Sequence, residues 1–169
     1  LMPATTTAPG EPFRIHATDA ELADLAARLS RARFPVEPDN AGWRYGANLA
    51  FLRELVEHWQ TRYDWRTWEA TLNRWPHYRV ALPAGDYGDI RLHYLIEQGS
   101  GPNPMPLLLL HGWPGSVFEF HKIIDPLAHP ERFGGAVEDA CTVICPSLPG
   151  YGFSTGLKRP ISPRAVAKL

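Results

Sequence analysis

The hydrophobic positions in the first half of the chain recur at helical spacing. There are three such stripes, at Leu22, Leu25, Ala26 and Leu29, at Leu52, Leu55, Val56 and Trp59, and at Trp65, Trp68 and Leu72. A polar residue suited to cap a helix precedes each stripe: Thr18, which forms a capping box with Glu21, then Asn48 and Asp64. Pro35 and Pro38 are expected to end the first helix. Residues 13–76 therefore predict a small helical region, whose short amphipathic helices need another surface to pack on.

From Tyr78 onward the pattern is that of strands. Apolar residues alternate with polar or small ones in two runs around the turn 85–88, at Tyr78, Val80 and Leu82 and at Ile90, Leu92, Tyr94 and Ile96. This arrangement predicts a β-hairpin. The four consecutive leucines at 107–110 do not alternate, which is typical of a central parallel strand covered on both faces. Cys141 to Cys145 predict another short buried strand.

Helices are expected to alternate with these buried strands. Ser116 is a candidate N-cap for one helix, and Ser162 with Pro163 opens another. The inward-facing residues of the first are expected to be Phe120, Ile123, Ile124 and Leu127. Parallel strands that alternate with helices predict an α/β fold. The sheet is not completed within 169 residues, so we expect the front part of a larger protein, with residues 77–169 as the first part of its core and residues 1–12 as a disordered leader.

Composition narrows the function classes. A net charge of −1 without a basic block argues against nucleic acid as a partner, and no stretch approaches the ~18 apolar residues of a membrane span. Cys141 and Cys145 have no histidine or second cysteine pair beside them, so we expect buried thiols, no metal site and a reducing, cytoplasmic location. No cofactor is predicted.

The turn from His111 to Gly115 lies where ligand sites of α/β sheets lie, just beyond the carboxyl end of a strand. Gly112 and Gly115 leave backbone N–H groups free to point into a cleft, where they can hold a developing negative charge on oxygen. A plain strand-to-helix turn without chemistry explains the same residues equally well. His111 itself is expected to be a packed residue at the strand end.

Several other motifs fail on inspection. Gly150-Tyr-Gly152 lacks the third glycine of a dinucleotide-binding loop, and Lys158 follows Gly156 at the wrong distance for a phosphate loop. There is no Gly-x-Ser-x-Gly. Asp86 lies between glycines, but in a hairpin and not after a buried strand, so we interpret it as a turn residue.

The turn His111-Gly-Trp-Pro-Gly-Ser116 resembles the His-Gly-x-Pro motif of epoxide hydrolases of the α/β-hydrolase superfamily. The loop Pro146-Ser-Leu-Pro-Gly-Tyr-Gly-Phe-Ser154 resembles the loop after the next strand in that family. The helical region is similar to the N-terminal domain of the microsomal-type branch, at Gly42-Trp-Arg-Tyr-Gly46, Phe51-Leu-Arg-Glu-Leu-Val56, Tyr63-Asp-Trp65 and Leu72-Asn73-Arg74. The resemblance covers residues 13–165. Haloalkane dehalogenases share the His-Gly-x-Pro motif but lack the helical lead-in.

The resemblance implies a two-step hydrolysis of a small-molecule epoxide to a vicinal diol. An aspartate opens the epoxide and forms a covalent ester, and a histidine oriented by a second acid activates the water that cleaves it. None of these three residues can be assigned in 1–169, which departs from the family pattern, so the fragment alone is expected to be inactive. The Trp113 backbone N–H would supply half of an oxyanion hole. The resemblance also implies a cis Trp113–Pro114 bond.

Other interpretations stay open. Tyr151 and Phe153 are expected either to line the entrance to the site or simply to pack. The truncated sheet edge should pair with the C-terminal remainder of the protein or with a second copy of the chain. A non-catalytic binding module, an esterase or a dehalogenase on the same scaffold is the alternative to an epoxide hydrolase.

Overall fold

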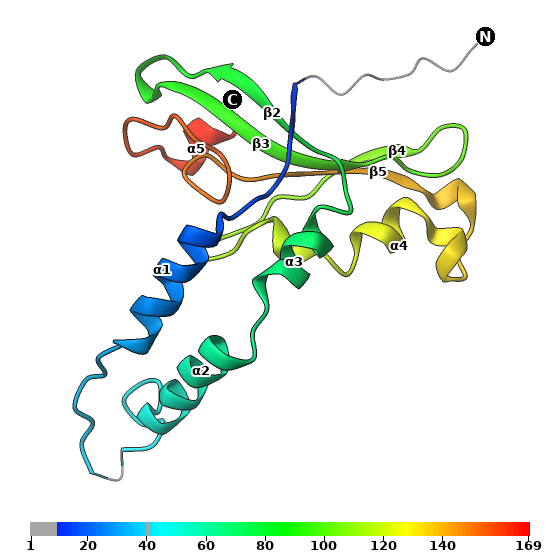
Figure 1. Ribbon diagram of the computed structural model, residues 1–169. Helices are drawn as coiled ribbons and strands as arrows, with labels where there is room; N and C mark the ends of the chain where they lie inside the picture. The colour runs from blue at the N-terminus through cyan, green and yellow to red at the C-terminus, as the bar shows by residue number, and fades with distance from the viewer. Residues whose placement is uncertain (1–9, 40) are drawn as a thin grey trace. The chain divides into compact units, whose positions relative to one another are not determined.

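The computed structural model describes residues 10–39 and 41–169 (Figure 1). The chain divides into two compact units, of which one comprises residues 15–70 and the other residues 71–169 with the N-terminal segment up to Arg14. Residues 1–9 of the predicted leader lie outside the described residues. Residues 11 and 12 correct that prediction, because Glu11–Phe13 forms a strand, β1, whose backbone pairs with another strand.

The three predicted helices are confirmed as α1 (Asp19–Ser30), α2 (Leu49–Thr61) and α3 (Trp65–Leu72). Thr18 and Glu21 form the capping box, and the Asn48 side chain accepts from the Phe51 N–H at 3.0 Å. Asp64 accepts from the Arg66 N–H at 2.9 Å. The first helix ends at Ser30, before the predicted prolines. No residue of α1 or α2 is fully buried, so their apolar stripes are at most half-covered.

A buried carboxylate joins the start of α1 to α3 within the unit 15–70. The Ala17 N–H donates to Glu69 Oε1 at 2.6 Å, and Arg66 donates to Glu69 Oε2 at 2.8 Å and to the Ala17 carbonyl at 2.6 Å. The hydrogen bond from Ala17, followed by those from Arg66 and Trp65, holds the pKa of Glu69 below its usual range.

The other unit is built on one mixed sheet of five described strands, in the order β1-β2-β3-β5-β4. Its strands are β2 (His77–Pro83), β3 (Asp89–Glu97), β4 (Met105–Leu108) and β5 (Cys141–Pro146), together with β1. The predicted hairpin is confirmed, with Val80 opposite Leu92 and a 3₁₀ turn at Gly85–Tyr87. Strands β1, β2, β3 and β5 pair antiparallel, whereas β4 and β5 are parallel.

The leucine strand is only partly covered by the described residues. It is parallel to β5, as predicted, and it is the edge strand of the described sheet. Leu108 and Leu110 are each 57% exposed, whereas Leu107 and Leu109 are half-buried. The described residues supply no strand beyond β4 and cover one face. Coverage of both faces in the full-length protein stays a prediction.

The segment after β4 also differs from the prediction. Ser116 does cap a helical turn, accepting from the Phe118 N–H at 3.2 Å, but that turn is a 3₁₀ helix over Val117–Phe120. A separate short helix, α4 (Ile124–Ala128), follows it. Ile124 is fully buried as expected, whereas Ile123 is 44% exposed because the break changes the helical phase. The last predicted helix is confirmed as α5 (Pro163–Val166), capped by Ser162.

Asp125 in α4 holds the residues that follow α3, and we expect its removal to destabilise the unit that contains residues 71–169. It accepts from the buried Trp75 Nε1 at 2.7 Å and pairs with Arg74 at 3.1 Å. Asp125→Ala leaves the indole N–H without a partner, which should lower the free energy of unfolding by about 1–3 kcal/mol in urea titrations. Asp125→Asn keeps an acceptor for Trp75 and should cost clearly less. Equal losses in the two variants would contradict this assignment.

Candidate functional site

The His111–Gly115 turn leaves the carboxyl end of β4 as a tight loop. The Gly115 N–H donates to the Gly112 carbonyl at 2.8 Å, and the predicted cis bond between Trp113 and Pro114 is present. A side chain at Gly115 would meet the Glu119 carboxylate, whereas one at Gly112 would meet open space. The Glu119 carboxylate ends a flexible side chain and can move aside, so packing of the described residues requires glycine at neither position.

The Trp113 backbone N–H donates to no acceptor among the described residues. It is therefore not part of an ordinary strand ladder. An N–H that is to bind an oxyanion must be free in this way. The Trp113 side chain is 83% exposed, and its neighbours Gly112 and Pro114 are exposed as well. The described residues thus free this N–H for a ligand but do not enclose it in the solvent-poor cleft that the sequence led us to expect.

The buried side chain of His111 holds the turn in place through hydrogen bonds. Its side chain is 3% exposed, as predicted for a packed residue, and its Nε2 accepts from the Leu148 N–H at 3.0 Å. Its Nδ1 lies 3.1 Å from the Gly112 carbonyl oxygen, which can only accept. His111 is therefore the neutral tautomer that carries its proton on Nδ1. It links the turn to the loop that follows β5.

That second loop, Pro146–Ser154, brings both predicted lining residues into packing contacts. The Tyr151 ring lies edge-on to His111, with ring centroids 5.1 Å apart. Phe153 packs on Phe13 at 5.6 Å and on His93 at 5.1 Å. Both rings are half-buried. Tyr151 thus belongs to the surroundings of the turn, and a role in lining a substrate site stays a prediction for both residues.

A buried chain of histidines and serines, missed in the sequence, lies beside this loop. The His77 Nε2 lies 2.8 Å from the Leu72 carbonyl, which fixes its proton there and makes Nδ1 an acceptor. His93 then donates from Nε2 to His77 Nδ1 at 2.8 Å, and its own Nδ1 accepts from the Ser147 hydroxyl at 2.9 Å. Ser154 accepts from the His93 N–H and donates to the Ser147 carbonyl.

Burial keeps the imidazoles of His77 and His93 neutral. It lowers the pKa of His77, and burial together with the nearby His77 and Arg79 lowers the pKa of His93 to about 3. His93 lies opposite Arg79 in the hairpin register and diagonal to His77, so the two histidines share one face. Only the strand pairing reveals this, because the sequence separates them by 16 residues.

Ser100, His129 and Glu97 have the composition of a hydrolytic triad but not its proton arrangement. Ser100 Oγ lies 2.6 Å from His129 Nδ1, and Glu97 lies 2.7 Å from Nε2. Ser100 also donates to Glu131 at 2.9 Å. With the Ser100 proton directed to Glu131, Ser100 Oγ can only accept from His129. Ser100 then has no base to activate it, so this cluster fastens the loop after β3 to the end of α4.

The remaining candidates carry no reaction chemistry. Cys141 and Cys145 are free and buried as predicted, and burial raises the pKa of the Cys145 thiol to about 12. Within residues 10–39 and 41–169, no group of histidine, cysteine and carboxylate side chains could hold a metal ion. In the same ranges, no helix combines the length and apolar character that crossing a membrane requires.

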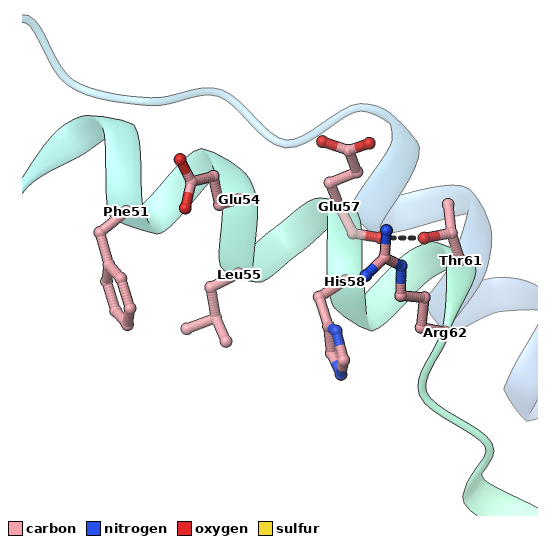
Figure 2. Close-up of a pocket in the computed structure, with 7 residues that line it drawn as sticks. All are labelled: Phe51, Glu54, Leu55, Glu57, His58, Thr61 and Arg62. Atoms are coloured by element: carbon pink, nitrogen blue, oxygen red, sulfur yellow. Dashed lines mark hydrogen bonds between the residues drawn. The ribbon is translucent and has the colours of Figure 1, made fainter.

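The unit 15–70 carries a hollow of about 390 Å³ along α2, lined by Phe51, Glu54, Leu55, Glu57, His58, Thr61 and Arg62. Figure 2 shows Phe51, Leu55 and His58 projecting from the same side of the helix. Phe51, Leu55 and the nearby Trp59 are 44–47% exposed, and Trp43 packs on Phe51 with ring centroids 5.2 Å apart. The hollow lies in a different unit from the turn, and no ion pair joins the side chains that line it among the described residues.

Comparisons with known proteins identify the family of the chain. The family described as Epoxide hydrolase N terminus matches residues 10–120, and the alpha/beta hydrolase fold matches residues 105–166. A Stigmatella aurantiaca protein named epoxide hydrolase is 48% identical over 143 residues, and Epoxide hydrolase 1 of Oryctolagus cuniculus is 37% identical over 147. Each match covers 85% of this chain and 31% of the relative, so the chain spans about a third of their length.

Solved structures lead to the same family. The epoxide hydrolase of Aspergillus niger superposes with a TM-score of 0.76 at 28% identity, covering 92% of this chain and 39% of that one. The juvenile hormone epoxide hydrolase of Bombyx mori superposes with a TM-score of 0.79 at 31% identity, covering 93% and 36%. The chain therefore belongs to the epoxide hydrolase family, of which it carries the N-terminal domain and the first part of the α/β-hydrolase fold.

Proposed function

We propose that the full-length protein carrying this chain adds water to a small-molecule epoxide and releases a vicinal diol. The observation that carries the proposal is the Trp113 N–H, which has no acceptor among the described residues and lies in a turn that His111 holds at the carboxyl end of a parallel strand. An amide in this position can bind the oxyanion of an ester being hydrolysed. The names of the relatives support the same reaction class.

The proposed chemistry has two steps. A carboxylate oxygen of an aspartate outside residues 1–169 attacks one epoxide carbon, the ring C–O bond breaks, and the alkoxide takes a proton from a tyrosine hydroxyl that also lies outside these residues. A histidine, oriented by a second acid, then deprotonates a water that attacks the ester carbonyl. The oxyanion formed in this second step accepts a hydrogen bond from the Trp113 N–H. Its collapse releases the diol and returns the carboxylate.

A single turnover in ¹⁸O-labelled water tests the proposal. With the full-length protein in excess over styrene oxide, the first diol should contain unlabelled oxygen, because that oxygen comes from the carboxylate. Later turnovers should incorporate the label. Label in the first diol would rule out the ester, and a protein without epoxide turnover would favour a binding module. The 169-residue chain should be inactive, since it lacks the nucleophile.

We propose also that the apolar side of α2 packs against the C-terminal remainder of the full-length protein. Phe51, Leu55 and Trp59 recur along one helix and are only partly covered within their unit. Partly exposed apolar residues gathered on one surface mark an interaction site more often than singly scattered ones do. Because the relatives are about three times longer, the remainder is the nearest candidate to cover them.

The substitution Leu55→Asp, measured in the full-length protein and in the 169-residue chain, distinguishes docking against the remainder from packing within the chain. In the full-length protein it should lower the free energy of unfolding by ~1.5–3 kcal/mol, the value of a buried leucine, and the melting temperature by several degrees. In the 169-residue chain it should have a much smaller effect, because Leu55 is already 47% exposed there. Calorimetry of both proteins makes the comparison. A loss of the same size in the short chain would show that the contact lies within the 169 residues and not with the remainder.

A further inference from the structure

The hydrogen bonds around Ser147 continue, through one peptide unit, to the turn that carries Trp113. Ser147 is fully buried and is held at three atoms. Its N–H donates to the His93 carbonyl at 2.8 Å, its carbonyl accepts from Ser154 Oγ at 2.6 Å, and its hydroxyl donates to His93 Nδ1 at 2.9 Å. Few orientations remain for the peptide that follows it.

The N–H of that following peptide belongs to Leu148 and donates to His111 Nε2 at 3.0 Å. The opposite ring nitrogen of His111 donates to the Gly112 carbonyl at 3.1 Å. This carbonyl and the Trp113 N–H belong to the same peptide group, which is planar. Fixing the direction of the carbonyl therefore fixes the direction in which the Trp113 N–H points.

We infer that Ser147 is a positioning residue, which aims the Trp113 N–H through Leu148 and His111. The inference rests on the proposed function, because the N–H needs an aim only if it binds an oxyanion. Ser147 touches no substrate. The Ser147 hydroxyl has one acceptor, His93 Nδ1, whose orientation is set in turn by His77 and the Leu72 carbonyl. The chain of contacts thus runs from the end of α3 to the turn without interruption.

Removing the Ser147 hydroxyl should make the orientation of the Trp113 N–H less well defined without removing any group that binds substrate. Ser147→Ala in the full-length protein should lower kcat for styrene oxide by ~tenfold, as a small misplacement of a catalytic group does, and leave KM unchanged. Ser100→Ala is the matched control. It also deletes a serine hydroxyl bonded to a histidine, but in the cluster around His129, which does not reach His111. Activities are compared below the melting temperature of each variant.

A second measurement reads the chain of contacts directly. In the full-length protein with ¹⁵N-labelled histidine, Ser147→Ala should shift the ring nitrogen signals of His111, which Ser147 does not touch, and Ser100→Ala should leave them in place. Unchanged His111 signals, or equal losses of kcat in the two variants, would overturn the inference. A wild-type protein without epoxide turnover would instead overturn the proposed function and the positioning role with it, and it is recognised before any variant is made.

Discussion

Replacing the backbone N–H of Trp113 by an oxygen is expected to lower epoxide hydrolysis by ~10²–10³-fold, equivalent to about 3–4 kcal/mol of transition-state stabilisation. The substitution incorporates the α-hydroxy analogue of tryptophan at position 113 of the full-length protein, which turns the amide into an ester and keeps the indole. The effect is large because the N–H has no acceptor among the described residues and is free to act on the reacting oxygen.

Trp113→Phe is the control for this experiment. It retains the amide and changes only a side chain that is 83% exposed in the described chain. If the proposed role is correct, the loss should follow the backbone N–H and not the indole, and it should fall on kcat with little change in KM, since the donor acts on charge that develops during the reaction. Full activity of the ester variant would remove Trp113 from the oxyanion hole.

Local sequence signals predicted the elements that depend on neighbouring residues. The three helix starts at Thr18, Asn48 and Asp64 follow from side chains that cap the helix a few residues later. The β2–β3 hairpin follows from two alternating runs around a glycine turn. In each case the decisive contact lies within a few residues along the chain, or directly across a short turn.

The failures have non-local causes. The alternation in β3 favoured Ile90, Leu92, Tyr94 and Ile96 as the covered residues, yet His93 and Leu95 are fully buried while Leu92 is half-buried. Both faces of the strand are covered around position 94, because the loop 147–154 returns to it. The leucines of β4 are a separate case. Their composition suits a buried strand, and whether that strand is central depends on what lies beyond the edge of the described sheet.

The candidate site divides in the same way. The turn and its cis bond could be predicted because a contiguous motif carries them. The chain from His77 to Ser147 could not, because it needs the register of one hairpin and the return of a loop 54 residues after His93. A histidine within an apolar strand is a weak signal by itself. Its meaning comes from the partners that the fold supplies to both ring nitrogens.

Acidification should destabilise the unit 71–169 through the buried histidines. An unfolded histidine takes up a proton below its ordinary pKa of 6.5, whereas His93 stays neutral down to about pH 3. Between these values the unfolded state binds more protons than the folded state, so the free energy of unfolding rises with pH. The contribution of His93 is fully present above pH 6.5 and is lost progressively as the pH falls toward 3. His93 alone should cost about 2 kcal/mol at pH 5 relative to pH 7, at 1.4 kcal/mol per pH unit below the ordinary value. The lowered pKa of His77 acts in the same direction.

Urea unfolding of the 169-residue chain at pH 7 and pH 5 measures this effect. His93→Gln keeps a donor for His77 and an acceptor for Ser147 but takes up no proton, so it should be less stable at pH 7 and show a smaller loss between the two pH values. His58→Gln removes an exposed imidazole from α2 and should keep the wild-type pH dependence. At pH 5 the carboxylates are still largely ionised, which limits their share of the change. A wild-type chain equally stable at both pH values, or an undiminished pH dependence in His93→Gln, would show that His93 takes up a proton without unfolding.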